Sequence, residues 1–302
     1  MKKVLLILNP SSGMGAAEVQ LYHIISSFAS NDCLVTVYPL LFEHGFSSRK
    51  ALELAKDQYD IVVCFGGDGT LSHTINDYIS MGLTVPLGYL PAGSTNDFAH
   101  SLGIPSDCIA GSKAIAHGKV FHYDVGCFND SYFNYIAAFG AFTKVTYETN
   151  QAFKNVLGYA AYVVSALFSV AESMNIRCPI TLEHDGKREE MSLIFGAVSN
   201  STSVAGFKVP FERDVKMDDG LFEVILIKAP ENFGDLTQII GCLAIGSLDN
   251  PFIQVFQTSE LHIIPHEHIA WTLDGEYGGT PEDILISNLK QCIPILIPDA
   301  GE

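Results

Sequence analysis

Hydrophobic and polar residues alternate in two different ways along this chain of 302 residues. Up to about residue 120, short apolar runs are separated by longer segments in which apolar residues recur every three or four positions. This rhythm predicts parallel strands joined by helices, forming a sheet that helices cover on both faces. The predicted strands are residues 4–8, 34–41, 61–65 and 85–90, and the predicted helices are residues 17–29, 48–57 and 71–81.

Beyond residue 120 the apolar segments become short and strand-like, with turn-forming residues between them. Such a pattern is typical of an antiparallel sheet or sandwich. Two helices, near residues 154–174 and 232–243, are expected to interrupt the strands. The predicted strands are residues 132–139, 177–184, 190–199, 221–228, 254–264 and 269–273.

The change of pattern near residues 118–123 indicates two domains. We expect an α/β N-terminal domain with a parallel sheet and glycine-rich loops over residues 1–120. A second, mainly antiparallel β-sandwich domain should span residues 121–292. The apolar stretch 293–297, within the C-terminal segment 293–302, predicts one more strand, and its return to the first domain is left open.

The composition narrows the range of partners. Hydrophobic residues make up 48% of the sequence and charged residues 17%, which favours packed cores over disorder. The formal net charge of -17 argues against duplex nucleic acid as a partner and against general adsorption to anionic membranes. The seven cysteines form no CxxC pair, and we expect them to be reduced in a cytoplasmic protein. The longest uncharged segment, residues 155–171, is too short to span a bilayer.

The most informative loop is the GGDGT motif at residues 66–70, directly after the predicted strand 61–65. Its glycines allow the backbone to turn tightly and to approach an anion without interference from a Cβ atom. The turn should deliver Asp68 to the carboxyl edge of a parallel sheet, where a carboxylate can hold Mg²⁺ bound to phosphate. Taken alone, the motif would be explained equally well by a strand-to-helix turn with a capping aspartate.

Two further loops follow predicted strands of the same sheet. Residues 9–13 read NPSSG and can bring amides and hydroxyls to a phosphate at a helix N-terminus. Residues 91–99 read PAGSTNDFA and combine hydroxyl and amide donors with a second carboxylate, Asp97. Capping explains one serine or asparagine in such a loop, but it does not explain the whole cluster. Because the three loops should converge at one sheet edge, together they predict a phosphate-binding site.

The NPSSG, GGDGT and PAGSTNDFA motifs, in this order and spacing, resemble those of the diacylglycerol-kinase catalytic domain family. Within that family the chain is similar to the bacterial soluble lipid kinases of the diacylglycerol kinase B and YegS/BmrU group. The resemblance covers nearly the whole chain and includes KMDDGLF at residues 216–222 and LDGE at residues 273–276. It implies an ATP-dependent kinase that uses Mg²⁺ and phosphorylates diacylglycerol or a related lipid hydroxyl in a cleft between the domains.

The resemblance also implies roles for individual residues. The ATP phosphates should lie against the three loops. Asp68 is a catalytic carboxylate that either binds the metal or orients the acceptor hydroxyl, and these two roles are left open. Leu40 stands where the family often has a threonine that touches the nucleotide, so this contact is not expected here. The implied nucleotide-binding residues are Asn9, Pro10, Ser11, Ser12, Gly13, Gly66, Gly67, Asp68, Gly69, Thr70, Leu71, Ser72, Ser94, Asn96 and Asp97.

In the second domain the resemblance implies a metal site and a catalytic base. Asp219 matches the carboxylate of a structural Mg²⁺ site that the backbone carbonyls of Lys216 and Leu221 would complete. Glu276 matches the base that takes the proton of the acceptor hydroxyl, with Asp274 as a supporting acid. From the residues alone, a tight Asp–Gly turn between strands explains each position as well.

A lipid acceptor requires peripheral contact with the inner face of the membrane, because no transmembrane segment is predicted. The apolar segment 153–168 can offer a wall for the lipid, although core packing explains most of it. Lys208, Arg213 and Lys216 can form a basic spot for anionic headgroups or an ordinary solvated connection. A homodimer is left open.

Two alternatives compete with the lipid kinase. NAD kinases share the GGDGT motif and a two-domain plan, but the PAGSTNDFA form of the third loop favours the lipid-kinase branch. A catalytically silent, nucleotide-binding regulatory protein would not need to retain Asp68, Asp97, Asp219 and Glu276.

Overall fold

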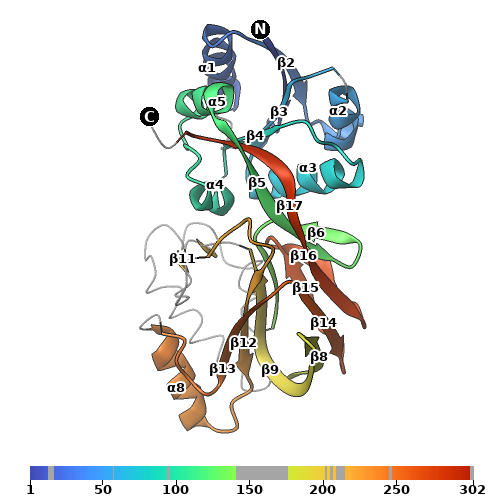
Figure 1. The fold of residues 1–302 in the computed structure, drawn as a ribbon, viewed down its shortest axis with the longest axis vertical. Helices are drawn as coiled ribbons and strands as arrows, with labels where there is room; N and C mark the ends of the chain where they lie inside the picture. Colours follow the sequence, from blue (N-terminus) through green and yellow to red (C-terminus); the bar gives the residue numbers. More distant parts are fainter. Residues whose placement is uncertain are drawn as a thin grey trace.

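The computed structural model describes residues 1–12, 17–56, 58–93, 96–140, 176–200, 203–204, 207–208, 215–244 and 247–299. Figure 1 shows an α/β part that holds the N-terminus and a β-rich part below it. Two long strands, β5 (Lys119–Phe128) and β17 (Ile284–Ile297), run from one part into the other and pair with each other in antiparallel fashion. These strands fix how the two parts lie relative to each other.

The α/β part is built on a parallel sheet. Its strands lie in the order β2 (Cys33–Pro39), β1 (Lys2–Leu8), β3 (Ile61–Gly66) and β4 (Leu87–Pro91). β17 continues the sheet beside β4, where Ile295 pairs in parallel with Leu87. The C-terminal segment therefore adds a strand to this sheet, which the sequence left open.

Helices cover both faces of the parallel sheet. They are α1 (Ala17–Ser30), α2 (Ser48–Ala55), α3 (Asp68–Ser80), α4 (Asp97–Ser101) and α5 (Cys108–His117), with a short 3-10 helix η2 (Phe42–His44). Leu5 and Val62 belong to the core that includes α2 and α3, whereas Leu6 and Val63 belong to the core that includes α1 and α5. Successive strand residues thus enter opposite cores, which is why these strands read as continuous apolar runs.

The β-rich part is an antiparallel sandwich. Away from β17, its strands follow in the order β14 (Glu260–Pro265), β8 (Cys178–His184), β9 (Lys187–Ser199), β7 (Ile136–Gly140), β15 (Trp271–Leu273) and β16 (Glu276–Gly279). Trp271 lies in its core, with ring centroids 4.5 Å from Phe139 and 5.0 Å from Phe128. The other elements are β6 (Ser131–Phe133) beside β5, β12 (Phe222–Lys228) between β9 and β13 (Ile253–Thr258), the hairpin β10 (Ser203–Val204) and β11 (Phe207–Lys208), and α8 (Phe233–Ala244).

The predicted fold class, a parallel α/β sheet followed by an antiparallel sandwich, is confirmed. The predicted strand 132–139 is divided into β6 and β7, and the predicted strand 254–264 into β13 and β14. Helix α3 begins at Asp68 rather than at residue 71, because Gly67 is an extended N-cap and an acidic first turn suits the helix dipole. The sequence did not predict α5 or β5, and the predicted helix 154–174 lies outside the described residues.

The boundary proposed near residues 118–123 stays a prediction, and β5 crosses this region as one continuous strand. Within the described ranges, no helix is both long and apolar enough to cross a membrane.

Candidate active site

Three loops that follow β1, β3 and β4 lie together at the carboxyl edge of the parallel sheet. The Asn9 side chain links the first two, since its Nδ2 donates to Thr70 Oγ1 at 2.8 Å. Its Oδ1 accepts the backbone N–H of Ser11 at 3.0 Å, which shapes the first loop as an Asx turn. The Ala92 N–H donates to the Gly66 carbonyl at 2.8 Å and joins the third loop to the second. The three loops therefore form one structural unit.

Two glycines of the second and third loops lie where a side chain has no room. A Cβ atom on Gly93 would lie 2.9 Å from the Cα of Gly67 and 2.8 Å from Asn96 Oδ1. A Cβ atom on Gly66 would lie 2.6 Å from the Cβ of Thr70. A side chain at Gly93 would force the second and third loops apart, and one at Gly66 would collide with Thr70 of its own loop, so glycine is needed at both positions for space.

Asn96 and Asp97 close the third loop. Asn96 has a left-handed backbone (φ 51°, ψ 42°), and its side chain bonds both the N–H of Gly93 (2.8 Å) and the carbonyl of Gly93 (3.0 Å). The Asp97 N–H donates to Asp68 Oδ2 at 3.3 Å, and the Tyr89 hydroxyl donates to Asp68 Oδ1 at 3.4 Å. Asp68 and Asp97, which begin α3 and α4, are therefore neighbours.

A pocket of about 320 Å³ is formed by the first and second loops together with two other segments. Part of its lining is polar and glycine-rich. Leu40 and Phe42, in the connection between β2 and α2, add an apolar part. Glu276, the first residue of β16, brings a carboxylate from the sandwich. The lining residues are Asn9, Ser12, Leu40, Phe42, Ser48, Gly67, Gly69, Thr70, His73 and Glu276.

Asp274 is a buried carboxylate that organises the neighbouring chain. Its Oδ1 accepts the backbone N–H groups of Tyr135 (3.0 Å) and Ile136 (3.2 Å). Its Oδ2 accepts the N–H (2.7 Å) and Nδ2 (2.9 Å) of Asn134 and the hydroxyl of Ser72 on α3 (3.1 Å). Burial raises the pKa of Asp274, while these hydrogen bonds act in the opposite direction. The carboxylate therefore joins β15, the start of β7 and α3.

Glu276 lies two residues farther along the same hairpin in a very different setting. Its side chain is 54% exposed, and a Cβ atom placed on Gly69 would lie 3.0 Å from its Oε1. Its Oε2 lies 3.3 Å from Nε2 of His73 on α3. The sandwich thus places a solvent-accessible carboxylate against the GGDGT loop of the α/β part.

Tyr135 marks the place where the site carboxylates gather. Burial raises its pKa strongly, and the charges of Asp274, Asp68, Asp97 and Glu276 add to the effect in that order. Its hydroxyl donates to the backbone carbonyl of Asp274 at 2.9 Å. Four carboxylates from both parts of the chain therefore share one neighbourhood.

Sequence reasoning missed Asn134, Tyr135 and His73. Asn134 and Tyr135 contact Asp274, and His73 contacts Glu276. Each contact joins residues more than 130 positions apart in the chain, so no local motif predicts it. Ser72 was expected at the nucleotide, but its hydroxyl donates to Asp274. The side chain of Leu71 is buried in the core, and its N–H bonds the Gly67 carbonyl.

Some predicted residues lie outside the described ranges. These are Gly13 and Ser94 of the nucleotide loops, and the segment 153–168 and Arg213 of the predicted lipid contact. Of Lys208, only the backbone is described.

The second predicted metal site is the turn that precedes β12. Asp219 Oδ1 accepts the N–H of Leu221 at 3.0 Å, and Lys290 Nζ donates to the Asp219 carbonyl at 3.1 Å. Burial raises the pKa of the adjacent Asp124, and the charge of Asp219 contributes to the shift. Among the described residues, no three histidine, cysteine, aspartate or glutamate side chains are placed to hold a metal ion. A site made of one carboxylate and two backbone carbonyls stays a prediction.

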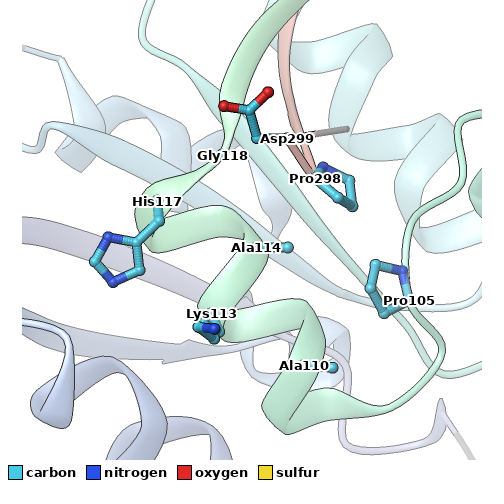
Figure 2. Close-up of a pocket in the computed structure, with 8 residues that line it drawn as sticks. All are labelled: Pro105, Ala110, Lys113, Ala114, His117, Gly118, Pro298 and Asp299. Carbon is cyan, nitrogen blue, oxygen red and sulfur yellow. The ribbon is translucent and has the colours of Figure 1, made fainter. Parts of the chain in front are cut away.

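A second hollow, of about 310 Å³, lies between α5 and the chain just after β17 (Figure 2). Ala110, Ala114 and Pro105 face it, whereas the His117 ring points away from it. None of the loop residues or of the carboxylates around Tyr135 lines this hollow, so we place the chemistry in the first pocket.

Two family models match the chain. Residues 3–128 match the family model of the diacylglycerol kinase catalytic domain. Residues 136–297, more than half of the chain, match the model of the YegS C-terminal NAD kinase beta sandwich-like domain. The first match contains the three loops, and the second contains Asp274 and Glu276.

Whole-chain relatives agree with both matches. The diacylglycerol kinases of Staphylococcus carnosus and Bacillus subtilis are each 27% identical to this chain, over 301 and 300 residues. These alignments cover 98% and 99% of this chain, and 95% and 97% of the relatives. The crystal structure of a diacylglycerol kinase from Bacillus anthracis superimposes with a TM-score of 0.74 at 23% identity, covering 100% of this chain and 98% of that one. At this identity the structural match establishes the fold.

Proposed function

The chain belongs to the diacylglycerol kinase catalytic domain family, in the group with a YegS-type C-terminal domain, and on this premise we propose its reaction. As a lipid kinase, it transfers the γ-phosphoryl group of ATP to a hydroxyl of diacylglycerol or a related lipid. The observation that carries this proposal is the position of Glu276. A carboxylate of the sandwich lies against Gly69 of the α/β part and lines the same pocket as the loops.

The pocket suits a nucleoside triphosphate. Its glycine-rich wall offers backbone amides and the Asn9 and Thr70 side chains to phosphate oxygens. Its apolar residues, Leu40 and Phe42, offer a surface on which a base can pack. We therefore propose that the phosphates of ATP lie along the loops, with the base toward Leu40 and Phe42.

Mg²⁺ fits the carboxylates of this site. Asp68 and Asp97 are neighbours, and hard divalent cations prefer carboxylate oxygens together with phosphate oxygens. Among the described residues that line the pocket there is no lysine or arginine, so side chains supply little positive charge for a triphosphate. When bound, Mg²⁺ would neutralise charge on the transferred group. We assign Asp68 as its main protein ligand and Asp97 as the second.

Glu276 is the base of the proposed reaction. Its exposed carboxylate can receive the proton of an acceptor hydroxyl, and a positioned base contributes roughly 10²- to 10⁴-fold to such a transfer. Asp274 is enclosed by five donors and lines no part of the pocket. We therefore assign Asp274 to holding the hairpin and α3 in place, rather than to proton transfer.

The lipid must bring its hydroxyl from the headgroup region to Glu276. We propose peripheral contact with the inner face of the membrane for this delivery. Asp219, with the carbonyls of Lys216 and Leu221, is proposed to hold a structural Mg²⁺ that orders the turn before β12.

A transfer assay tests the proposed function. The protein is incubated with [γ-³²P]ATP and Mg²⁺, in parallel with mixed micelles of diacylglycerol, with phosphatidylglycerol and with NAD. We expect label in the organic phase, no label in NAD, and loss of the lipid product in Asp68→Ala. Asp130→Ala, an exposed substitution in the turn between β5 and β6, is the matched control and should retain activity.

The alternative outcomes separate the competing functions. Labelled NADP without labelled lipid would establish a NAD kinase, the class to which the sandwich is also likened. Nucleotide binding without any labelled product would indicate a regulatory protein.

A further inference from the structure

His73 lies beside the proposed base in a position that the proposed reaction does not yet use. It follows Gly69 by four residues on α3, so both residues lie on the same face of the helix. Side chains on a helix lean toward its N-terminus, which carries the His73 ring back over the GGDGT turn. There its Nε2 lies 3.3 Å from Glu276 Oε2, and the ring lines the same pocket.

The negative charges near the pocket explain why Glu276 needs the contact with His73. Asp68, Asp97, Asp274 and Glu276 all act on Tyr135 as negative charges. Among the described residues that line the pocket, His73 is the one side chain able to carry a positive charge, and its Nε2 is in contact with Glu276. Without it, Glu276 would face other carboxylates and incoming phosphates of the same sign, and would turn outward to solvent.

The contact cannot matter much for the stability of the fold. The His73 side chain is 60% exposed and that of Glu276 is 54% exposed, and ion pairs at such exposure contribute little to stability. Its effect should therefore be on the orientation of Glu276. The two carboxylate oxygens are already distinguished, because Oε2 contacts the imidazole while Oε1 is the one beside Gly69.

We propose that His73 is a positioning residue for phosphoryl transfer: its Nε2 holds Glu276 by Oε2, so that Oε1 faces the GGDGT loop where the acceptor hydroxyl must arrive. This inference rests on the proposed function, in which Glu276 takes the hydroxyl proton. An alternative role for the same ring is direct contact with the ATP phosphates. The two roles differ in a measurable way, because the first affects the rate of transfer and the second affects nucleotide affinity.

The experiment compares His73→Ala and His73→Gln with wild type. Glutamine keeps an N–H donor close to the position of imidazole Nε2, whereas alanine removes it. We expect kcat for lipid phosphorylation to fall by about tenfold to a hundredfold in His73→Ala, the usual effect of a misplaced catalytic group. The KM for ATP and the Kd of a non-hydrolysable ATP analogue should stay unchanged, and His73→Gln should recover most of kcat.

His23→Ala, at an exposed histidine of α1, is the matched control and should behave as wild type in every measurement. Thermal unfolding of each variant shows that the fold is retained. Full kcat in His73→Ala would overturn the inference, as would a weaker Kd for the analogue or a failure of glutamine to rescue. If wild type itself phosphorylates no lipid, the proposed function falls and the role of His73 falls with it. An active wild type with an active His73→Ala removes the His73 inference alone.

Discussion

Two hairpin turns of the sandwich have the same sequence and the same backbone but different surroundings. Asp185–Gly186 joins β8 to β9, and Asp274–Gly275 joins β15 to β16. Both aspartates have positive φ (47° and 50°), as do both glycines (73° and 85°). These are the residues that a two-residue hairpin with a positive-φ turn requires.

The two aspartate side chains nevertheless differ in exposure and in the direction of their pKa shifts. The Asp185 side chain is 55% exposed, and its hydrogen bond with His184 lowers its pKa. Asp274 is 5% exposed, and burial raises its pKa. The turn itself is therefore a local property, whereas the role of its carboxylate depends on which distant segment packs over it.

Replacing each aspartate by alanine should give the largest difference in stability between the two turns. Asp274→Ala would leave three backbone N–H groups and the Asn134 amide without an acceptor in a buried place. An unsatisfied buried donor costs about 1–3 kcal/mol, so the loss of unfolding free energy should exceed about 3 kcal/mol. Asp185→Ala loses two part-buried hydrogen bonds, from His184 and from Thr258, but leaves no backbone N–H group without an acceptor, so its effect should be smaller. Urea unfolding at pH 7 measures both; equal losses would show that Asp274 is no more than a turn residue.

Much of the fold could be predicted from the sequence because its causes are local. The apolar runs of β1 and β3, the glycines of the GGDGT motif and the Asp–Gly turns each carry their own signal. The site could be predicted only in part. The role of Asp274 depends on its hydrogen bonds with Asn134 and Ser72, which are 140 and 202 positions away in the chain. The pattern of apolar and polar residues does not predict such long-range contacts. A surface turn and a buried organising carboxylate look the same in sequence.

Substituting the glycine of each turn should cause smaller losses of stability, and it separates the effect on stability from the effect on kcat. Gly186→Ala and Gly275→Ala both place an L side chain at positive φ, which costs about 1–2 kcal/mol. Neither Cβ would meet an atom closer than 3.9 Å, so the two stability losses should be similar. Only Gly275→Ala should also lower kcat, because it shifts Glu276, the next residue. Unchanged kcat in Gly275→Ala, despite the measured strain, would mean that the turn geometry does not position the base.

The smallest expected effect is a dependence on pH. The folded pKa of Asp185 lies below its ordinary value of 3.8, so its contribution to stability is present above that value and is lost as pH falls through the folded pKa. Asp185→Asn should therefore be slightly less stable than wild type at pH 7. The difference should disappear in strongly acidic solution. Unfolding free energies measured across this range check the prediction, and a difference that persists at the acidic end would contradict it.

The proposed reaction depends above all on Glu276, which acts from the sandwich on a nucleotide held by the α/β part. The most direct test measures lipid phosphorylation and ATP-analogue binding together in Glu276→Gln. Because the side chain is more than half exposed, the fold and the Kd of the analogue should be those of wild type. The account predicts that kcat falls by about 10²-fold or more, the contribution of a general base. A Glu276→Gln variant that binds the analogue normally and phosphorylates lipid at near wild-type kcat would contradict it.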